Sequence, residues 1–390
     1  MKLFRRQSSG TVVLSANSCW YIYNFRLPLI VALQQQGRHV AVVAPRDDYT
    51  DRLLAAGCRV MPIKIRSKSV NPFYELRTVR RYWRRYAMLK PGVIIHFTPK
   101  PNIYGTFIAH LLGIPCINDI AGLGNAFVRK SVLSVVVRLL YRITQSRVHT
   151  VFFQNQDDYR FFLHHRIVRR EQAVLLPGSG VQLQHFVPRP LQRSVPDSSG
   201  ANSAAKTDAV RFIMIARLIA EKGVGLYAEA ARELRTRYPQ VEFDLVGYID
   251  TNNPGAYSQQ EVESWQKEGV LRWVGRQEDV RPFIAAADCV VLPSYYREGT
   301  PRTLLEGAAM AKPLIAADSI GCREPVTHGY NGFLCQPRDR NSLIAAMERI
   351  VTMSPSDRQV MGQRSRAIAE TRYNMDIVLA AYLKAVSSVG

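Results

Sequence analysis

Two glutamates bracket a turn from loop to helix in the second half of the sequence. They stand in SYYREGTPRTLLEGAAMAKP, where Glu298 precedes the predicted helix and Glu306 lies in its second turn. Thr300 suits the N-cap and Pro301 the first helical position, so the pattern predicts a helix from Pro301 to about Ala311.

The start of this helix is a candidate anion site. Its first N–H groups have no partner within the helix, and Gly299 allows a ligand to approach them closely. Two carboxylates would repel a phosphate that they met directly, so Glu298 and Glu306 fit better as acceptors for hydroxyl groups beside it, such as those of a ribose and a hexose. Spacing alone leaves an alternative open, in which both glutamates stabilise the helix dipole and bind nothing.

Two cations stand at the end of an earlier predicted strand. FIMIARLIAEKGV places Arg217 and Lys222 in the turn between a strand and a helix that is predicted to begin near Gly223. Arginine offers a bidentate fork and lysine a point charge, so both can face one diphosphate. The alternative is that they are ordinary solvated charges on a loop.

These motifs must be positioned by elements that alternate along the chain. Short β-branched runs separated by helix-length segments predict an α/β fold with parallel sheets. The predicted strands are TVVLSA (11–16), HVAVVAP (39–45), GVIIHF (92–97), IPCIND (114–119), HTVFFQ (149–154), VRFIMIA (210–216), VEFDLVG (241–247), LRWVG (271–275), CVVLPS (289–294) and KPLIAAD (312–318).

Composition also predicts two domains. The chain has 390 residues, and 47% of them are hydrophobic, enough for two cores. A segment rich in Pro, Ser and Ala, residues 188–208, predicts a linker or surface loop between a domain of residues 1–187 and one of residues 209–372. Residues 373–390 are expected to form a C-terminal helix that returns to the first domain.

The charge is uneven. The formal net charge is +21, and residues 1–200 hold 29 Lys and Arg against 9 Asp and Glu. This asymmetry predicts an anionic partner for the first half, either nucleic acid or an acidic membrane surface.

Targeting and redox signals are weak. The six cysteines are scattered without a C-x-x-C pair, a pattern typical of reduced thiols in a cytosolic protein. The apolar run near the start is too short for a signal peptide, and Arg138 interrupts the longest apolar segment. The expected protein is soluble, with at most peripheral membrane attachment.

Taken together, the motifs resemble those of a known family. Glu298 and Glu306 in EGTPRTLLEGAAMAKP are similar to the E-x7-E motif of retaining glycosyltransferases of family 4, which have the GT-B fold of two Rossmann-like domains facing a central cleft. Arg217 and Lys222 match the R-x4-K pair of that family. NFRLPLIVALQQQGRHVAVVAP, HFTPKPNIYG, GLGNAF and PGSGV resemble the bacterial branch that adds N-acetylhexosamine or related sugars to polyprenyl-diphosphate-linked acceptors in surface polysaccharide or glycan assembly.

The resemblance implies roles for the second-domain residues. Arg217 and Lys222 would bind the diphosphate and neutralise its charge as it leaves. Glu306 would bind the ribose, Glu298 the donor hexose, and the amides near Arg302 and Thr303 the distal phosphate. Retention in this family is described as attack on the face from which the leaving phosphate departs, so no protein nucleophile is required. The resemblance makes Glu298, Arg217 and Lys222 the catalytic residues, and a covalent role for Glu298 as nucleophile is the alternative to hydroxyl binding.

The first domain departs from the family pattern. The family's glycine pair after the first strand reads SANSCWYIYNF here, and its H-E-P-type segment reads HFTPKPN. Lys100 stands where an acid would be common and is expected to contact a phosphate or sugar. Asn17 and Ser18 are expected near the transferred sugar. His96 lies within a strand end, where a structural role competes with a ligand role.

No D-x-D motif occurs in the sequence, so metal-independent transfer is expected, with Arg217 and Lys222 replacing the cation. No cofactor is expected beyond the nucleotide sugar, which is predicted to be linked to UDP. A GDP- or UDP-hexose used on another acceptor, a non-catalytic protein and a sugar-nucleotide epimerase are the alternatives that keep the fold.

A basic stripe suggests where the first domain meets an anion. LRTVRRYWRRYAMLK places arginines 77, 80, 81, 84 and 85 on one helical face beside Tyr82, Trp83 and Tyr86, and residues 129–147 form a second basic segment. Such faces suit an anionic bilayer, which would place the protein in the cytoplasm on the inner face of the membrane. Solvated helix faces are the alternative. Nucleic acid is not expected, because no recognised motif accompanies the charge.

Overall fold

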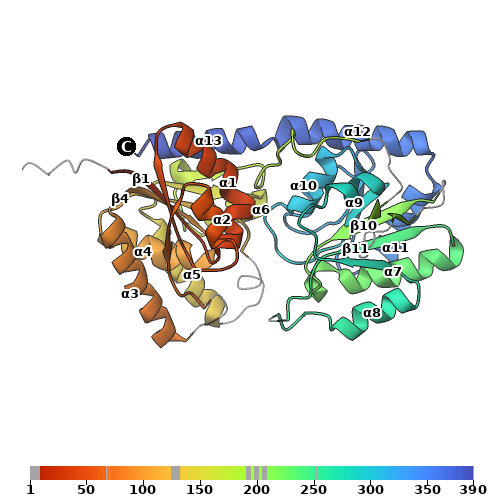
Figure 1. The fold of residues 1–390 in the computed structure, drawn as a ribbon, viewed down its shortest axis with the longest axis horizontal. Coiled ribbons are helices and arrows are strands. Elements are labelled where there is room, and N and C mark those ends of the chain that lie inside the picture. The colour runs from red at the N-terminus through yellow and green to blue at the C-terminus, as the bar shows by residue number, and fades with distance from the viewer. Residues whose placement is uncertain are drawn as a thin grey trace, which may run out of the picture. The chain divides into compact units, whose positions relative to one another are not determined.

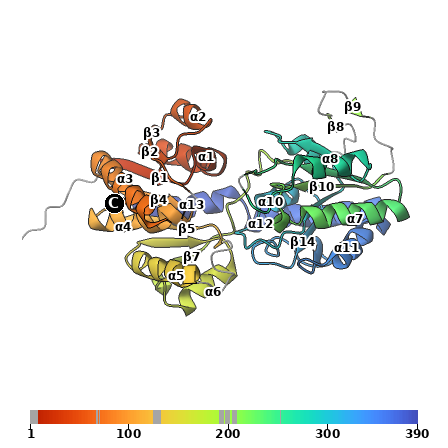
Figure 2. The same ribbon diagram turned by 90° about the horizontal axis from the view of Figure 1, so that it is seen from below.

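The computed structural model describes residues 9–66, 69, 71–123, 132–189, 195–196, 202–203, 209–251 and 253–389. Contacts divide the chain into two compact units: unit 1 comprises Met1–Ser179 and Asp376–Gly390, and unit 2 comprises Gly180–Met375. Most of the predicted linker 188–208 lies outside the described residues. Helices flank both faces of the sheet in each unit (Figure 1, Figure 2).

Unit 1 is built on a seven-stranded parallel sheet with the order β3-β2-β1-β4-β5-β6-β7. Its strands are β1 (Ser9–Ser15), β2 (His39–Ala44), β3 (Arg59–Pro62), β4 (Pro91–Phe97), β5 (Cys116–Ile120), β6 (Thr150–Phe153) and β7 (Ala173–Leu175). Its helices are α1 (Cys19–Gln35), α2 (Thr50–Ala55), α3 (Pro72–Leu89), α4 (Thr106–Leu111), α5 (Val132–Gln145), α6 (Gln156–His164) and α13 (Met375–Ser387).

Two apolar clusters cover the two faces of this sheet. Alternate residues of β1 separate between them, because side chains of a strand point to opposite faces: Val12 and Leu14 join the cluster under α1, α2 and α13, and Val13 joins the cluster under α3 to α6. The C-terminal helix therefore belongs to the core of unit 1, where Tyr382 is fully buried.

Unit 2 repeats the architecture with a six-stranded parallel sheet of order β12-β11-β10-β13-β14-β15. Its sheet strands are β10 (Arg211–Ile215), β11 (Glu242–Val246), β12 (Arg272–Gly275), β13 (Cys289–Leu292), β14 (Leu314–Ala317) and β15 (Gly332–Cys335), and a small hairpin pairs β8 (Val195–Pro196) with β9 (Asn202–Ser203). Its helices are α7 (Val224–Arg237), α8 (Gln259–Lys267), α9 (Arg281–Ala286), α10 (Arg302–Ala309), α11 (Arg340–Thr352) and α12 (Pro355–Arg372).

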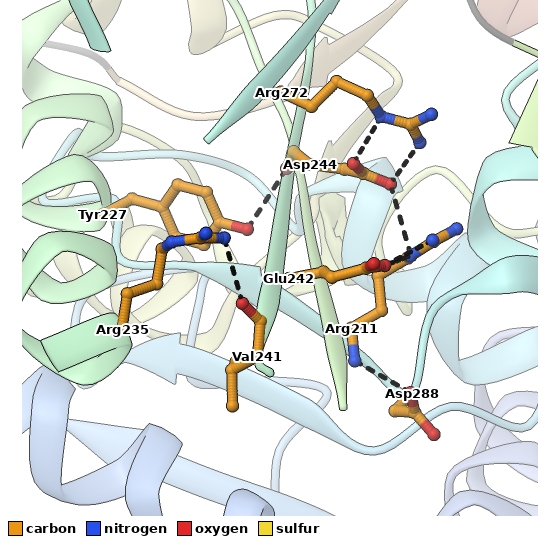
Figure 3. A network of polar contacts seen from close by, with 8 residues as sticks. All are labelled: Arg211, Tyr227, Arg235, Val241, Glu242, Asp244, Arg272 and Asp288. Atoms are coloured by element: carbon orange, nitrogen blue, oxygen red, sulfur yellow. Dashed lines mark hydrogen bonds and ion pairs between the residues drawn. The ribbon is translucent and has the colours of Figure 1, made fainter. Parts of the chain in front are cut away.

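An ionic network ties three strands of unit 2 together (Figure 3). Asp244 of β11 is 2% exposed and accepts two 2.8 Å bonds from the guanidinium of Arg272 in β12. Arg211 of β10 bonds Glu242 of β11, and its backbone N–H donates to Asp288. Every buried carboxylate here has a cationic or N–H partner, as burial of a charge requires.

The α/β fold with two parallel-sheet, Rossmann-like units is confirmed, but the predicted face of α3 is wrong in part. Tyr82 and Tyr86 do not accompany the arginines outward; both have 0% exposure and pack in the core of unit 1. Arg81 and Arg85 turn toward β3, where they donate to the carbonyls of Lys64 and Pro62. Only Trp83 of the three aromatic residues is exposed.

Candidate active site

The two motifs of unit 2 follow strands that are neighbours in its sheet. Strand order runs outward from β10 through β11 to β12 on one side, and from β13 through β14 to β15 on the other. The direction reverses between β10 and β13, and open α/β sheets bind ligands beyond the carboxyl ends of their strands at such a point. Arg217 and Lys222 follow β10, and Glu298 follows β13, so all three lie at this edge.

Lys222 and Glu298 meet directly. The ammonium Nζ of Lys222 donates to Oε2 of Glu298 at 2.6 Å, and the two side chains are 14% and 13% exposed. Lys222 ends a short 3-10 turn, Ala220–Lys222, which stops at Gly223 with φ +79°. A Cβ on Gly223 would lie 2.4 Å from the carbonyl oxygen of Pro293. Only glycine at this position therefore lets the loop after β10 approach the loop after β13 so closely.

The Glu298 loop is held by further bonds. The backbone N–H groups of Tyr295 and Tyr296 both donate to the carbonyl of Glu221, next to Lys222. Ser294 has no exposed surface, and its hydroxyl donates to Oε1 of Glu298 at 2.7 Å. The carboxylate is thus fixed by a cation on one oxygen and a hydroxyl on the other.

Arg217 pairs with an acid that the sequence analysis did not single out. Its Nη1 lies 3.1 Å from Oδ2 of Asp250, which follows the neighbouring strand β11. Arg217 and Glu298 also act on one hydroxyl, that of Tyr296: burial raises the pKa of Tyr296, Arg217 lowers it, and Glu298 raises it. We call Arg217, Lys222 and Glu298, which share this edge of the sheet, the charged cluster of unit 2.

We expect the Asp250→Ala variant to lower kcat/KM for sugar transfer about tenfold, because the guanidinium loses the acceptor that orients it. The Arg217 side chain is 37% exposed, and such pairs contribute only about 0–1 kcal/mol to stability, so the melting temperature should change little. Steady-state kinetics and thermal unfolding measure both. Glu268→Ala, which breaks the exposed Arg232–Glu268 pair in the same unit, is the matched control. Equal kinetic losses in the two variants would contradict the assignment.

Helix α10 carries the second glutamate. It runs Arg302–Ala309 with Pro301 as its N-cap, so it begins one residue later and ends two residues earlier than predicted. Glu306 is 8% exposed, and its Oε1 lies 2.7 Å from Nε of Arg302, one turn earlier. Burial raises the pKa of Glu306, and Arg302 opposes that shift.

Thr303 anchors the start of α10 to the strand at the centre of the sheet. Its hydroxyl donates to the carbonyl of Ile215, the last residue of β10, at 3.0 Å. Gly299 is buried in the preceding loop, and a Cβ on Gly321 would lie 1.6 Å from its carbonyl oxygen. The N–H end of the helix is therefore fixed against β10, the strand that Arg217 follows.

In unit 1, the ammonium of Lys100 already has three hydrogen-bond partners within the protein. Its ammonium donates to the carbonyls of Arg66 and Ser69, at 2.6 and 2.8 Å, and to Oε1 of Glu75 at 2.6 Å. Three donors of the ammonium thus meet three acceptors. Contact with a phosphate or sugar, as predicted, would require at least one of these bonds to break.

His96 is likewise engaged in the core. It has no exposed surface, and its Nδ1 and Nε2 lie 2.9 and 3.0 Å from the oxygens of Asn118 and Tyr86. Burial lowers the pKa of His96 to about 3. These contacts favour the structural role of the two that the sequence left open.

The burial of His96 predicts a pH dependence of stability. Its pKa is lowered in the folded state, so the unfolded chain binds the extra proton first and stability falls as pH drops below about 6.5. Between pH 6.5 and 5, where most carboxylates stay ionised, the loss should approach about 1.4 kcal/mol per pH unit for this group. Urea unfolding of unit 1 across this range is the measurement. A His96→Asn variant should have a flatter profile, and an unchanged slope would contradict the prediction.

Asn17 and Ser18 follow β1, which neighbours β4 where the strand order of unit 1 reverses. Both are half-buried, and the hydroxyl of Ser18 accepts the N–H of Tyr21 as the N-cap of α1. Thr98, just after β4, was not predicted. It adopts φ +68°, and within the described part of the chain its buried hydroxyl has no hydrogen-bond partner. Strain of this kind gathers at ligand sites.

Among the residues that the structure describes, no three His, Cys, Asp or Glu side chains gather closely enough to hold a metal ion. A pocket of about 530 Å³ in unit 1 is lined by Thr11, Arg38, His39 and Arg59 among others, at the amino ends of β1 to β3. It is therefore at the edge of the sheet opposite to Asn17.

Sequence reasoning missed Asp250, Ser294 and Thr98. Asp250 could have been found by the same rule that selected Arg217, since it closely follows the carboxyl end of a predicted strand. Ser294 was inside the motif, but its orientation toward Glu298 depends on the loop.

Comparisons with known proteins match both halves of the chain. Residues 209–353 match the family model described as glycosyl transferases group 1, and residues 11–155 match the model described as glycosyl transferase 4-like. The N,N'-diacetylbacillosaminyl-diphospho-undecaprenol alpha-1,3-N-acetylgalactosaminyltransferase of Campylobacter jejuni is 26% identical and aligns over 93% of this chain and 94% of its own length. A UDP-Gal:alpha-D-GlcNAc-diphosphoundecaprenol alpha-1,3-galactosyltransferase of Escherichia coli is 24% identical over 78% of this chain and 77% of its own.

The fold has solved counterparts. HepE of Anabaena, in complex with UDP and glucose, superposes with a TM-score of 0.77 at 18% identity and covers 97% of this chain and 99% of its own. Sucrose-phosphate synthase of Thermosynechococcus elongatus superposes with a TM-score of 0.76 at 17% identity, covering 97% and 98%. Both family matches, the doubled parallel-sheet fold and these relatives agree, and the chain therefore belongs to the family 4 glycosyltransferases with the GT-B fold.

Proposed function

We propose that the protein transfers a sugar of the N-acetylhexosamine type from a UDP-sugar to a polyprenyl-diphosphate-linked saccharide, as a step in bacterial surface polysaccharide or glycan assembly. The observation that carries this proposal is the alignment with the Campylobacter enzyme along nearly the whole of both chains. The cluster at the reversal point of unit 2 supports it, since Arg217 and Lys222 supply two cations for a diphosphate.

In the proposed reaction, an acceptor hydroxyl attacks the anomeric carbon as the bond to the diphosphate oxygen breaks on the same face. The proton passes to the leaving phosphate, and the configuration is retained. Lys222 and Arg217 stabilise the charge that develops on the diphosphate, without a metal ion. Glu298 accepts hydroxyl hydrogen bonds from the donor hexose, Glu306 from the ribose, and the N–H groups of Arg302 and Thr303 donate to the distal phosphate.

A different donor hexose is the second candidate, because the printed name of the Escherichia coli relative specifies UDP-Gal. Purified protein incubated with a polyprenyl-diphosphate-linked saccharide and, separately, UDP-GalNAc, UDP-GlcNAc, UDP-Gal, UDP-Glc and a GDP-hexose distinguishes the two by product mass spectrometry. We expect one UDP-N-acetylhexosamine to be preferred. Preference for a plain hexose would favour the second candidate, and no product with any donor would overturn both.

Two finer points need their own readouts. The coupling constant of the anomeric proton in the product reports whether configuration is retained, and an inverted product would exclude same-face attack. Transfer in excess EDTA tests the metal requirement, and activity that needs an added divalent cation would contradict the role given to Arg217 and Lys222.

We further propose that the protein works in the cytoplasm as a peripheral protein on the inner face of the membrane, where a polyprenyl-linked acceptor resides. No helix among the described residues combines the length and hydropathy of a membrane span. The excess of Lys and Arg in the first 200 residues supports attraction to anionic lipid.

A further inference from the structure

Three helices of unit 1 expose large apolar side chains on one side of its sheet. Helices α3, α4 and α5 pack over the same sheet face and lie next to one another (Figure 1). Their exposed residues are Phe73, Leu76, Trp83 and Met88 of α3, Phe107 and Leu111 of α4, and Val135, Val136, Leu139 and Ile143 of α5. We call this set the apolar face.

The exposure is too high and too regular for isolated surface residues. Phe73 is 77% exposed, Leu76 69% and Leu111 57%. Along α3 and α5 the exposed positions, arginines included, recur every three or four residues, so each helix turns one side toward solvent and the opposite side to the core. Single exposed hydrophobic residues are ordinary, but contiguous apolar patches mark interaction sites.

The charges around the apolar face are of one sign. Arg77, Arg80 and Arg84 are exposed on α3 and alternate with its apolar residues, and Arg142 is exposed on α5. In the three helices as the structure describes them, the one carboxylate is that of Glu75, which is buried and bonded to Lys100. An apolar face edged by arginines with no exposed acid suits an anionic lipid surface.

We propose that this composite face, with α4 at its centre, is the membrane-docking surface, and that its apolar residues insert among the lipids of an anionic leaflet. The inference rests on the proposed peripheral location and deepens it in two respects. Attachment is apolar as well as electrostatic, and it includes α4, which carries neither Lys nor Arg. Arg81 and Arg85 are not part of it, because they bond β3 and its following loop.

Vesicle flotation with the full chain tests the surface. Wild-type protein should float with vesicles of phosphatidylcholine and phosphatidylglycerol and bind pure phosphatidylcholine more weakly. Partitioning onto the vesicles should fall about tenfold in each of Leu76→Asp, Leu111→Asp and Leu139→Asp, because each variant removes an inserted leucine. It should fall about fivefold in each of Arg77→Ala, Arg80→Ala and Arg84→Ala, because each removes one attraction to anionic lipid. Leu54→Asp is the matched control, since Leu54 is 49% exposed on α2, over the other sheet face.

The depth to which the apolar face inserts can be measured with Trp83, which belongs to that face. With Trp20, Trp265 and Trp273 replaced by Phe, Trp83 is the remaining tryptophan of the chain. Its fluorescence should shift to the blue on binding anionic vesicles and be quenched by brominated acyl chains. If the protein bound the vesicles but brominated acyl chains did not quench Trp83 fluorescence, insertion of the apolar face would be overturned. The same holds if the leucine variants bind vesicles as tightly as the wild type. A dimer in solution that the leucine variants dissociate, without vesicle binding, would assign the face to self-association instead.

The proposed chemistry is tested separately with a short-chain, water-soluble acceptor. The leucine variants should transfer sugar to it at the wild-type rate, because the apolar face lies in unit 1 and Arg217, Lys222 and Glu298 lie in unit 2. A wild-type protein that binds vesicles but glycosylates no acceptor would defeat the proposed function and leave the docking surface standing. A reduced rate on the soluble acceptor in all three leucine variants would overturn the docking assignment.

Discussion

Lys222→Ala is expected to lower kcat/KM for sugar transfer by about two to three orders of magnitude. The ammonium is largely buried at the point where strand order reverses and is already aimed by its bond to Glu298. Preorganised charges that meet a developing negative charge contribute on this scale when they are removed singly. Initial rates with the preferred UDP-sugar provide the measurement.

A double-mutant cycle separates the contribution of Lys222 from that of its partner Glu298. Removing Lys222 also leaves the Glu298 carboxylate without its cation, so part of any loss comes from a misplaced glutamate. If the two residues act as a unit, Lys222→Ala/Glu298→Ala should be little worse than the poorer single variant. Lys267→Ala, at the end of α8, is the control for loss of a lysine elsewhere in unit 2.

Glu306 should behave differently from Lys222. A ribose contact is made equally before and during the reaction, so Glu306→Ala should raise the KM for the donor more than it lowers kcat. Full activity in either Lys222→Ala or Glu306→Ala would contradict the assignment of the nucleotide-sugar site to this edge of the sheet.

The second large effect is on stability: Asp119→Ala should destabilise unit 1 by about 3–5 kcal/mol. Asp119 has no exposed surface, and its Oδ2 lies 2.5 Å from Nη2 of Arg26. Tyr382 of α13 donates to the same oxygen at 2.6 Å, and Gln154 donates to both carboxylate oxygens at 3.1 Å. Alanine would leave the guanidinium of Arg26 buried without its carboxylate.

Fluorescence can isolate this loss in unit 1. Trp20 and Trp83 lie in unit 1, and Trp265 and Trp273 lie in unit 2, so a background with both unit 2 tryptophans changed to Phe reports urea unfolding of unit 1. Tyr382→Phe removes one hydrogen bond to a charged group and should cost about 1.5–3 kcal/mol. An Asp119→Ala loss no larger than that of Tyr382→Phe would contradict the prediction.

The sequence predicted most of the sheet strands because most of them are buried. All ten predicted runs overlap observed strands, and the strands of the two parallel sheets that were missed, β3, β7 and β15, are edge strands of three or four residues. The two-residue strands β8 and β9 lie within the segment that was predicted as a linker. Neither β3 nor β7 has a buried residue, so they do not produce the continuous apolar run that identifies a buried parallel strand. Strand β15 is mostly buried but is only four residues long.

The site was predictable to the level of strand ends and no further. Arg217, Lys222 and Glu298 could be placed at one edge because parallel strands end together. The sequence could not indicate that Lys100, also at a strand end, turns its ammonium to Glu75, because that depends on the conformation of a loop thirty residues away. Likewise, helical spacing grouped five arginines, but only packing against β3 separates Arg81 and Arg85 from the others.

The position of α13 bears on synthesis of the protein. Residues 376–389 complete the core of unit 1, yet the whole of unit 2 is translated between them and Ser179. While that unit emerges from the ribosome, the Arg26–Asp119 pair lacks the hydroxyl of Tyr382, and the apolar groove that receives Val378 and Val386 stays open. Unit 1 therefore cannot finish folding first, against the usual order for a nascent chain. Until the C-terminal helix arrives, the apolar residues that it covers stay exposed, and transiently exposed surface of this kind makes a folding chain prone to aggregation.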